Sequence, residues 1–221
     1  MPEANSANSA SRPTTAVCLA LTGASGMPYG LRLLECLLDA GRHVQLVYSP
    51  IARIVARQET DVTLPEEAAD AQRQLRAHFA ESPGRLDVYG HEDWFAPMAS
   101  GSNPPSAMVV CPCTMGTLAA IAQGLASNLI ERAADVMLKE NRPLILAPRE
   151  TPFSAIHLEN MLRLSRAGAV LLPPNPGFYH RPRTAAELVD FVVARILDQL
   201  NVPHQLAARW GKITQSNPPC P

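Results

Sequence analysis

Small and hydroxyl-bearing residues follow the first apolar run of the sequence. The run at 16–21 ends at Thr22-Gly23-Ala24-Ser25-Gly26, and Pro28 then opens a helical pattern. Small side chains let backbone N–H groups approach an anion, and the positive end of a helix dipole favours negative charge. The segment lacks the full G-x-G-x-x-G spacing and the Walker lysine, so neither a dinucleotide motif nor a P-loop is predicted. We predict a phosphate-binding turn, with a plain tight turn as the alternative.

Three later apolar runs end in residues of the same kind. Ser49 follows the second run, at the start of a helix, where its hydroxyl can donate to the same anion. The segment 111–117 leads small and hydroxylated residues into another helix, and Arg149 with Glu150 places a cation and a carboxylate after a further run. Several anion-friendly strand ends on one sheet favour one shared ligand over coincidence.

Isolated polar residues elsewhere have a simpler explanation. Glu59 follows the second helical pattern, and Arg132 lies on the helix after Asn128; solvated helix faces account for such charges. Asp135 and Lys139 have the spacing of an i, i+4 ion pair. By the same reasoning from the residues alone, His180 is a surface or hydrogen-bonding histidine.

The elements that must position these groups alternate along the chain. Apolar runs predict strands at 16–21, 43–48, 107–110, 144–147 and 169–172, and helical patterns fall at 28–40, 51–58, 64–80, 114–122, 129–139, 154–165 and 186–200. Near-continuous apolar strands are typical of a parallel sheet covered on both faces. We therefore predict a single-domain α/β fold with a doubly wound parallel sheet, flavodoxin-like or Rossmann-like, that binds its ligand at the carboxyl ends of the strands.

Composition supports a globular chain of one domain. The 221 residues are 47% hydrophobic and 18% charged, with a formal net charge of -1, which gives no bulk attraction to nucleic acid or acidic membranes. Residues 1–15 lack the apolar core of a signal peptide and are predicted to be a disordered leader, 16–210 the folded domain and 211–221 a flexible tail. No apolar run approaches the ~20 residues that span a bilayer.

The five cysteines are an odd number without the spacing of a disulfide scaffold. A reducing, cytoplasmic compartment is therefore predicted. Cys111-Pro112-Cys113 is too tightly spaced for a zinc or redox pair, and no second pair completes a tetrahedral site. We predict structural cysteines and no metal site.

Taken together, six motifs from Val17 to Trp210 resemble UbiX-type flavin prenyltransferases. These are Thr22-Gly23-Ala24-Ser25-Gly26 with Tyr29-Gly30, Cys111-Pro112-Cys113 with Gly116-Thr117-Leu118, Asn128 to Asp135, Pro148-Arg149-Glu150, His157-Leu158-Glu159-Asn160-Met161 and Pro176-Gly177-Phe178-Tyr179. The resemblance implies an FMN-binding subunit that joins the dimethylallyl group of dimethylallyl monophosphate to reduced FMN without a metal. It also implies a homododecamer with active sites at subunit interfaces, whose product, prenylated FMN, serves UbiD-type decarboxylases, commonly in ubiquinone synthesis.

The resemblance assigns a role to each matching position. FMN would be bound by Gly23, Ala24, Ser25, Ser49, Thr114, Met115, Gly116, Thr117 and Arg149. The dimethylallyl phosphate would be held by Tyr179 and Arg195, with Arg132 and Lys139 from a neighbouring subunit, beside the Ala99-Ser100 loop and Trp210. Ser25 would lie near the departing phosphate, and Glu59 and Glu150 would handle proton transfers, with little to rank them.

Two departures and three alternatives accompany this interpretation. Thr114 stands where the family often has Ser, and Pro50 removes one backbone N–H beside Ser49. The alternatives are an FMN-dependent decarboxylase of aromatic acids, a decarboxylase of cysteine peptides, and a non-catalytic FMN-binding subunit. Met98 and Gly101-Ser102 depart from the Pro-Ala-Ser-Ala-Asn loop of the cysteine type, and a binding subunit would not need the paired glutamates.

Overall fold

The computed structural model describes residues 16–207, which contain six strands, seven α-helices and one short 3-10 helix. The strands are β1 (Ala16–Leu21), β2 (His43–Tyr48), β3 (Arg85–Tyr89), β4 (Ala107–Cys113), β5 (Leu144–Pro148) and β6 (Val170–Leu171). The helices are α1 (Met27–Asp39), α2 (Pro50–Glu59), α3 (Ala68–His78), η1 (Pro97–Ala99), α4 (Met115–Ala122), α5 (Leu129–Lys139), α6 (Ala155–Arg166) and α7 (Ala185–Gln199). Strands and helices alternate, as the apolar runs predict.

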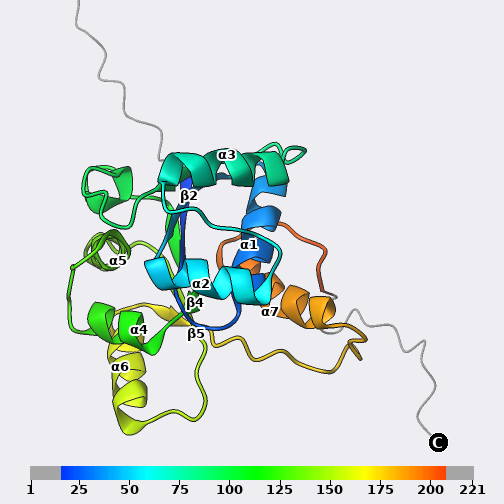
Figure 1. Ribbon diagram of the computed structural model, residues 1–221. Coiled ribbons are helices and arrows are strands. Elements are labelled where there is room, and N and C mark those ends of the chain that lie inside the picture. The colour runs from blue at the N-terminus through cyan, green and yellow to red at the C-terminus, as the bar shows by residue number, and fades with distance from the viewer. Residues whose placement is uncertain (1–15, 208–221) are drawn as a thin grey trace, which may run out of the picture.

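All six strands are parallel and lie in the order β3-β2-β1-β4-β5-β6 (Figure 1). This is the Rossmann order, and without the edge strand β3 the remaining five strands have the flavodoxin order. The predicted doubly wound parallel sheet is therefore confirmed. The chain reverses its direction of winding between β1 and β4, so their carboxyl ends border the crevice in which this class of fold binds ligands.

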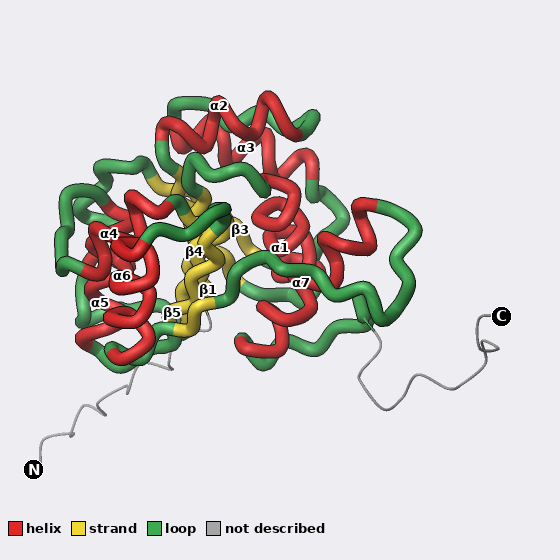
Figure 2. Tube along the Cα trace, turned by 90° about the horizontal axis from the view of Figure 1, so that it is seen from below, coloured by secondary structure: helices red, strands yellow, loops and turns green. Residues whose placement is uncertain are grey.

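Helices cover both faces of the sheet. The helices α4, α5 and α6 lie on one side and α1 and α7 on the other, with α2 and α3 packed into the same apolar cluster as α1 (Figure 2). All six residues of β1 and all seven of β4 are buried. Burial on both faces explains why these strands are continuous apolar runs.

Side-chain caps fix where most of the helices begin. The capping residues are Ser49, Thr114, Asn128, Ser154 and Thr184, each of which accepts a hydrogen bond from a backbone N–H in the first turn. These bonds pair N–H groups that have no partner inside the helix. The predicted helix starts are consequently correct to within a residue or two for these five helices.

Two predicted elements have wrong bounds, and one is missing from the prediction. The helix expected at 64–80 begins only at Ala68, because Leu64 precedes a proline and the Pro65 carbonyl accepts a 2.6 Å hydrogen bond from Tyr48 in β2. The strand expected at 107–110 continues to Cys113, which pairs with Pro148 after a register shift. β3 was not predicted, since its alternating polar and apolar residues give no continuous apolar run.

The cysteines inside the described range are free thiols, and three of the four are buried. Burial raises the pKa of Cys18 and of Cys111 to about 12 in each case, and it also raises the pKa of Cys113. Protonated, buried thiols behave as packing groups, in agreement with the structural role predicted for Cys111 and Cys113. Cys220, like the predicted leader and tail, lies outside residues 16–207.

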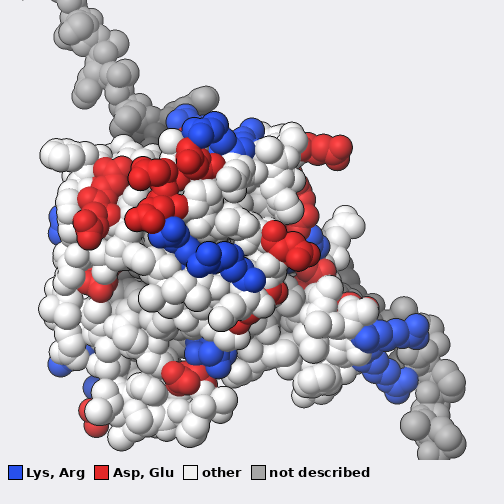
Figure 3. Space-filling model, viewed as in Figure 1, with Lys and Arg blue, Asp and Glu red and all other residues white. Residues whose placement is uncertain are grey.

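Charge is mixed over the face drawn in Figure 3, where basic side chains over α2 are interleaved with acidic ones. Arg53 of α2, for example, lies 3.1 Å from Glu66. This interleaving agrees with the small net charge. From residue 16 to residue 207, no helix is both long enough and apolar enough to cross a membrane.

Candidate active site

The buried hydroxyl of Thr22 joins the ends of β1 and β4. Thr22 Oγ1 donates to the Pro112 carbonyl oxygen and accepts from the Thr114 N–H, both at 2.8 Å, while the Thr22 N–H donates to the same carbonyl at 3.2 Å. The residue is only 1% exposed. The two loops that border the crevice are therefore held in one fixed relation. Sequence reasoning included Thr22 in the turn but gave it no role, although a hydroxyl at the end of an otherwise apolar run is a usable signal.

The turn after β1 also lies against the start of α2. A Cβ atom on Gly23 would overlap the Ile51 side chain, so only glycine permits this approach. The Ser49 N–H donates to the Leu21 carbonyl at 3.0 Å, and Ser49 Oγ accepts from the Ala52 N–H at 3.2 Å. Ser49 thus caps α2 with a lone pair, which leaves its hydroxyl hydrogen available for another acceptor; its role in ligand binding stays a prediction.

The N-terminal end of α1 holds a protein carboxylate. Gly26, in the left-handed region with φ 119°, begins the helix, and the N–H groups of Gly26 and Met27 both donate to Glu59 Oε2 at 2.8 Å. The prediction that the α1 terminus supplies an external anion site is therefore wrong for these two N–H groups. The FMN-binding role of the remaining turn residues, Gly23 to Ser25, stays a prediction.

Several donors hold Glu59 in its ionised form. Burial by itself would raise the pKa of this carboxyl, but hydrogen bonds from Ser25, Gly26 and Met27 and the positive charge of Arg149 keep the pKa below its ordinary value. An anion with three donors is well fixed and is a weak base. The distant pairing of Glu59 with the first turn could not be read from the sequence, since 33 positions separate Glu59 from Gly26.

Arg149 ties the end of β5 to the same turn. Its N–H donates to the Cys113 carbonyl at 3.3 Å, and its Nε donates to the Ser25 carbonyl at 3.1 Å. The adjacent Glu150 is exposed, and its Oε1 accepts from the Thr151 N–H at 3.1 Å. The cation thus lies beside the β1 turn, and the carboxylate follows it in sequence at the carboxyl end of β5.

The start of α4 completes this edge. Thr114 Oγ1 accepts from the Thr117 N–H at 3.1 Å and donates to Thr117 Oγ1 at 2.9 Å. The nearest atom to a Cβ on Gly116 would be 3.9 Å away, so the backbone of this exposed glycine faces open space. We name the segments 22–26, 49, 114–117 and 149–150 the strand-end cradle. Its hydroxyls, open backbone and guanidinium fit the phosphate and ring edge of FMN.

A second group of predicted residues lies along α5. Arg132 Nε donates to the Ala99 carbonyl at 2.9 Å, which holds the segment before Ser100 against the helix. Arg132 also pairs with Asp135 at 3.0 Å, and Lys139 pairs with Glu140 at 2.7 Å. The predicted Asp135–Lys139 pair is therefore wrong, because each residue has a nearer partner of opposite charge.

Lys139 lies at the amino edge of the sheet, away from the cradle of its own chain. The N–H at the start of α5 donates to the His91 carbonyl, just beyond the carboxyl end of β3, whereas Lys139 ends α5 shortly before β5 begins at Leu144. An 11-residue helix spans about 15 Å between its first and last residues. The structure therefore does not bring Lys139 together with Ser25 in one chain.

A third group lies on α7 and on the loop before it. Tyr179 is 77% exposed, and its ring is 3.6 Å from where a Cβ on Gly177 would be. That same position is 3.1 Å from Phe191, on which His180 stacks with ring centroids 5.4 Å apart. Arg195 follows Phe191 by one helical turn, so Tyr179 and Arg195 flank the same part of α7. Trp210, the remaining predicted residue, lies outside residues 16–207.

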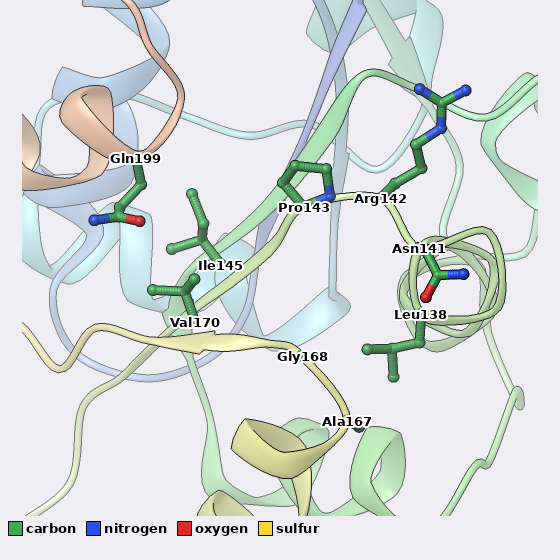
Figure 4. Close-up of a pocket in the computed structure, with 9 residues that line it drawn as sticks. All are labelled: Leu138, Asn141, Arg142, Pro143, Ile145, Ala167, Gly168, Val170 and Gln199. Atoms are coloured by element: carbon green, nitrogen blue, oxygen red, sulfur yellow. The ribbon is translucent and has the colours of Figure 1, made fainter.

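Two hollows elsewhere on the surface contain none of the predicted site residues. One, of about 420 Å³, lies at the amino edge between the C-terminal ends of α5, α6 and α7, with Ile145 and Val170 in its wall (Figure 4). The other, of about 600 Å³, lies between the ends of β2 and β3 and is lined by Tyr48 and Tyr89.

Comparison with known proteins identifies the family to which this fold belongs. Residues 5–197 match the Flavoprotein family. The flavin prenyltransferase UbiX of Pseudomonas aeruginosa is 56% identical over 196 residues, which cover 89% of this chain and 94% of that protein. UbiX of Methanocaldococcus jannaschii is 44% identical over 89% of this chain and 99% of its own length.

Solved structures agree with these relatives. The crystal structure of AnUbiX (PadA1) in complex with FMN and dimethylallyl pyrophosphate matches with a TM-score of 0.79 and 39% identity, covering 88% of this chain and 96% of that one. A dodecameric FMN-dependent UbiX-like decarboxylase from Escherichia coli O157:H7 matches with a TM-score of 0.79 and 41% identity over 88% and 98% of the two chains. The chain belongs to the Flavoprotein family, among its UbiX-type flavin prenyltransferases.

Proposed function

We propose that this chain joins the dimethylallyl group of dimethylallyl monophosphate to reduced FMN, giving prenylated FMN. The observation that carries the proposal is the strand-end cradle, in which hydroxyls and open backbone lie beside the Arg149 guanidinium, with the exposed Glu150 as the next residue. Membership of the UbiX-type family gives the proposal its substrate class.

The cradle holds FMN in this proposal. The residues involved are Gly23, Ala24, Ser25, Ser49, Thr114, Met115, Gly116, Thr117 and Arg149. Reduced FMN supplies the nucleophilic nitrogen and the neighbouring ring carbon that accept the prenyl group. Hydroxyl and N–H donors bind the FMN phosphate, and Arg149 supplies positive charge at the edge of the ring.

The two glutamates have different surroundings, which support different roles for them in the proposal. Glu59 accepts hydrogen bonds from Gly26 and Met27 and has a lowered pKa, so it fixes Ser25 and the first turn. Glu150 is exposed and is the better placed to remove the ring proton that ring closure releases. The sequence alone does not rank the two carboxylates as candidates for the base, so this ranking rests on their surroundings in the structure.

The prenyl phosphate binds to positive side chains. As the carbon–oxygen bond breaks, the departing phosphate gains negative charge, which Arg132, Lys139, Tyr179 and Arg195 stabilise, with Ser25 nearby. Ser100 and Trp210 line the space for the prenyl chain. Because α5 places Lys139 at the amino edge, the lysine serves the cradle of a neighbouring copy. A homododecamer with sites at its interfaces follows as part of the proposal.

The cellular setting is proposed on the same family grounds. The product passes to a UbiD-type decarboxylase, in ubiquinone synthesis where the organism makes ubiquinone. A cytoplasmic location is proposed from the reducing environment that the five cysteines favour.

One incubation tests the reaction. Full-length protein is mixed anaerobically with reduced FMN and dimethylallyl monophosphate, and the flavin is examined by mass spectrometry. We expect a mass increase equal to one prenyl group with release of one phosphate. An unchanged flavin would exclude the proposed reaction.

The rival activities are examined with the same preparation. The Escherichia coli structure is described as a decarboxylase, so an aromatic acid is supplied with FMN alone and carbon dioxide release is measured. A cysteine-ending peptide tests the second decarboxylase class, and FMN binding without any turnover would indicate a binding subunit.

A further inference from the structure

Three side chains at the end of α7 contact one another. Arg195 Nη1 donates to Asp198 Oδ2 at 2.7 Å, and His204 Nε2 lies 3.2 Å from Asp198 Oδ1. Each oxygen of one carboxylate therefore has its own partner. We name Arg195, Asp198 and His204 the α7 trio.

The backbone after α7 brings His204 back to the helix. Asn201 has φ 53°, in the left-handed region, and the Val202 N–H donates to the Leu197 carbonyl at 3.0 Å. Val202 is 4% exposed, so the turn is anchored in the apolar core. The contact between His204 and Asp198 is thus set by the fold and does not depend on a mobile surface chain.

Burial increases from the arginine to the histidine. The side chains of Arg195, Asp198 and His204 are 56%, 30% and 10% exposed. Among residues 16–207, buried His204 Nδ1 has no hydrogen-bond partner. Because a carboxylate oxygen can only accept, the ring nitrogen that faces Asp198 carries a proton, and Nε2 donates to Asp198.

We propose that Asp198 and His204 are positioning residues that orient the Arg195 guanidinium toward the phosphate of the prenyl donor. This inference rests on the proposed function, which gives Arg195 that ligand. An exposed arginine has many rotamers, and an ion pair three residues along a helix restrains it weakly. A second hydrogen bond, from His204, holds the Asp198 carboxylate in one orientation. The oriented carboxylate in turn restrains Arg195 Nη1, which donates to it. The other N–H groups of the guanidinium then have a defined direction.

Charge alone predicts the opposite result. Asp198 is negative, so its removal would strengthen phosphate binding if attraction were the only effect. Orientation predicts weaker binding instead. The sign of the change in phosphate affinity therefore distinguishes a positioning role for Asp198 from a simple surface ion pair.

The test uses full-length variants and two readouts. Asp198→Ala and His204→Leu remove the two positioning groups, and His204→Gln keeps an N–H donor near Nε2. Asp190→Asn is the matched control, because Asp190 on the same helix pairs with Arg32 at 2.7 Å. The first readout is steady-state kinetics, in which KM for dimethylallyl monophosphate and kcat are determined separately. The second is the affinity for the product, inorganic phosphate, measured by titration without turnover. FMN affinity and melting temperature serve as controls for folding.

We expect Asp198→Ala and His204→Leu to weaken both measured affinities roughly tenfold, the size expected for one hydrogen bond to a charged group, with kcat less affected. His204→Gln and Asp190→Asn should stay near the wild type. Unchanged or tighter phosphate binding in Asp198→Ala and His204→Leu would overturn the proposal while leaving the proposed function intact. An Arg195→Ala variant that binds phosphate normally would overturn it as well. Absence of prenyl transfer by the wild type would reject the proposed function separately, since the phosphate titration needs no turnover.

Discussion

At the carboxyl edge of the sheet, hydrogen bonds join loops from four different strands, whereas along α5 they join one helix to the short segment beside it. Thr22, Arg149 and Glu59 each bond to a part of the chain distant in sequence. Arg132 and Lys139 instead pair with residues within three positions of themselves, and they lie against the segment 99–101, where Arg132 bonds to the Ala99 carbonyl and Lys139 Nζ lies close to Gly101. The residues proposed to bind FMN are therefore joined to one another within one chain, whereas Lys139 is proposed to serve the site of a neighbouring copy.

This difference supports the proposal that the site is completed by two copies of the chain. Fixed loops at the strand ends provide a preorganised surface for a rigid ligand. A long cationic side chain at the amino-edge end of α5, that of Lys139, suits a phosphate bound in the cradle of a different copy. The following variants test that division.

The largest effect is expected at the cradle. Glu150→Gln removes the carboxylate proposed to take the ring proton, so we expect kcat to fall roughly 10²- to 10⁴-fold with FMN binding retained. Stopped assays with mass spectrometry of the flavin measure the rate. The exposed Glu81→Gln is the matched control. Normal turnover by Glu150→Gln would show that another group removes the ring proton.

The next effect is expected on α5. Lys139→Ala should lower kcat/KM roughly 10²-fold, because a phosphate loses a charged partner. Mixing Lys139→Ala with Glu150→Gln in one oligomer should restore part of the activity, since some interfaces then combine a normal lysine with a normal glutamate. Lack of recovery after verified subunit exchange would place both residues in the site of a single chain.

A smaller effect is expected where β1 and β4 are joined. Thr22→Val keeps the shape but leaves the half-buried Thr114 N–H without its partner and the Pro112 carbonyl with only the backbone N–H of residue 22, which should reduce the free energy of unfolding by about 1–3 kcal/mol. FMN affinity should fall in parallel because the two loops lose their fixed relation. Denaturant unfolding and FMN titration measure both changes. Thr22→Ser keeps the hydroxyl and should behave more like the wild type.

The smallest effect concerns acid stability. The pKa of folded Glu59 lies below its ordinary value of 4.5, so its ionised form stabilises the fold above that value. The stabilisation is lost as the pH falls from about 4.5 through the lowered pKa. Glu59→Gln should therefore be less stable than the wild type at neutral pH, and the gap should narrow on acidification. A gap that stays constant down to acid denaturation would show that Glu59 does not titrate in this way.

The sheet could be predicted from the sequence because its central strands are buried on both faces. The bounds predicted for β1 and β2 equal those observed, whereas the edge strand β3, with Arg85 and Asp87 alternating with apolar residues, was missed. Helix starts followed from capping side chains such as Ser49 and Thr114. Continuous apolar runs and capping side chains therefore predict the central strands and the helix starts, whereas the weak alternation of the edge strand β3 does not predict that strand.

Within the site, local pattern identified the positions but could not give their partners. Arg149 was placed correctly at a strand end, yet its bond to the Ser25 carbonyl depends on sheet order. The Asp135–Lys139 pair failed because spacing alone cannot choose between Lys139 and the equally near Arg132. Glu59 was found through resemblance, and only its bonds to Gly26 and Met27 distinguish it from Glu150.

The buried hydroxyl of Thr22 also has a dynamic consequence. The loop after β4 cannot open without breaking a bond to the loop after β1, so the two loops should fluctuate as one cooperative unit. The Thr114 amide should then exchange its hydrogen with solvent water as slowly as amides within the central strands, although it lies at the rim of the site.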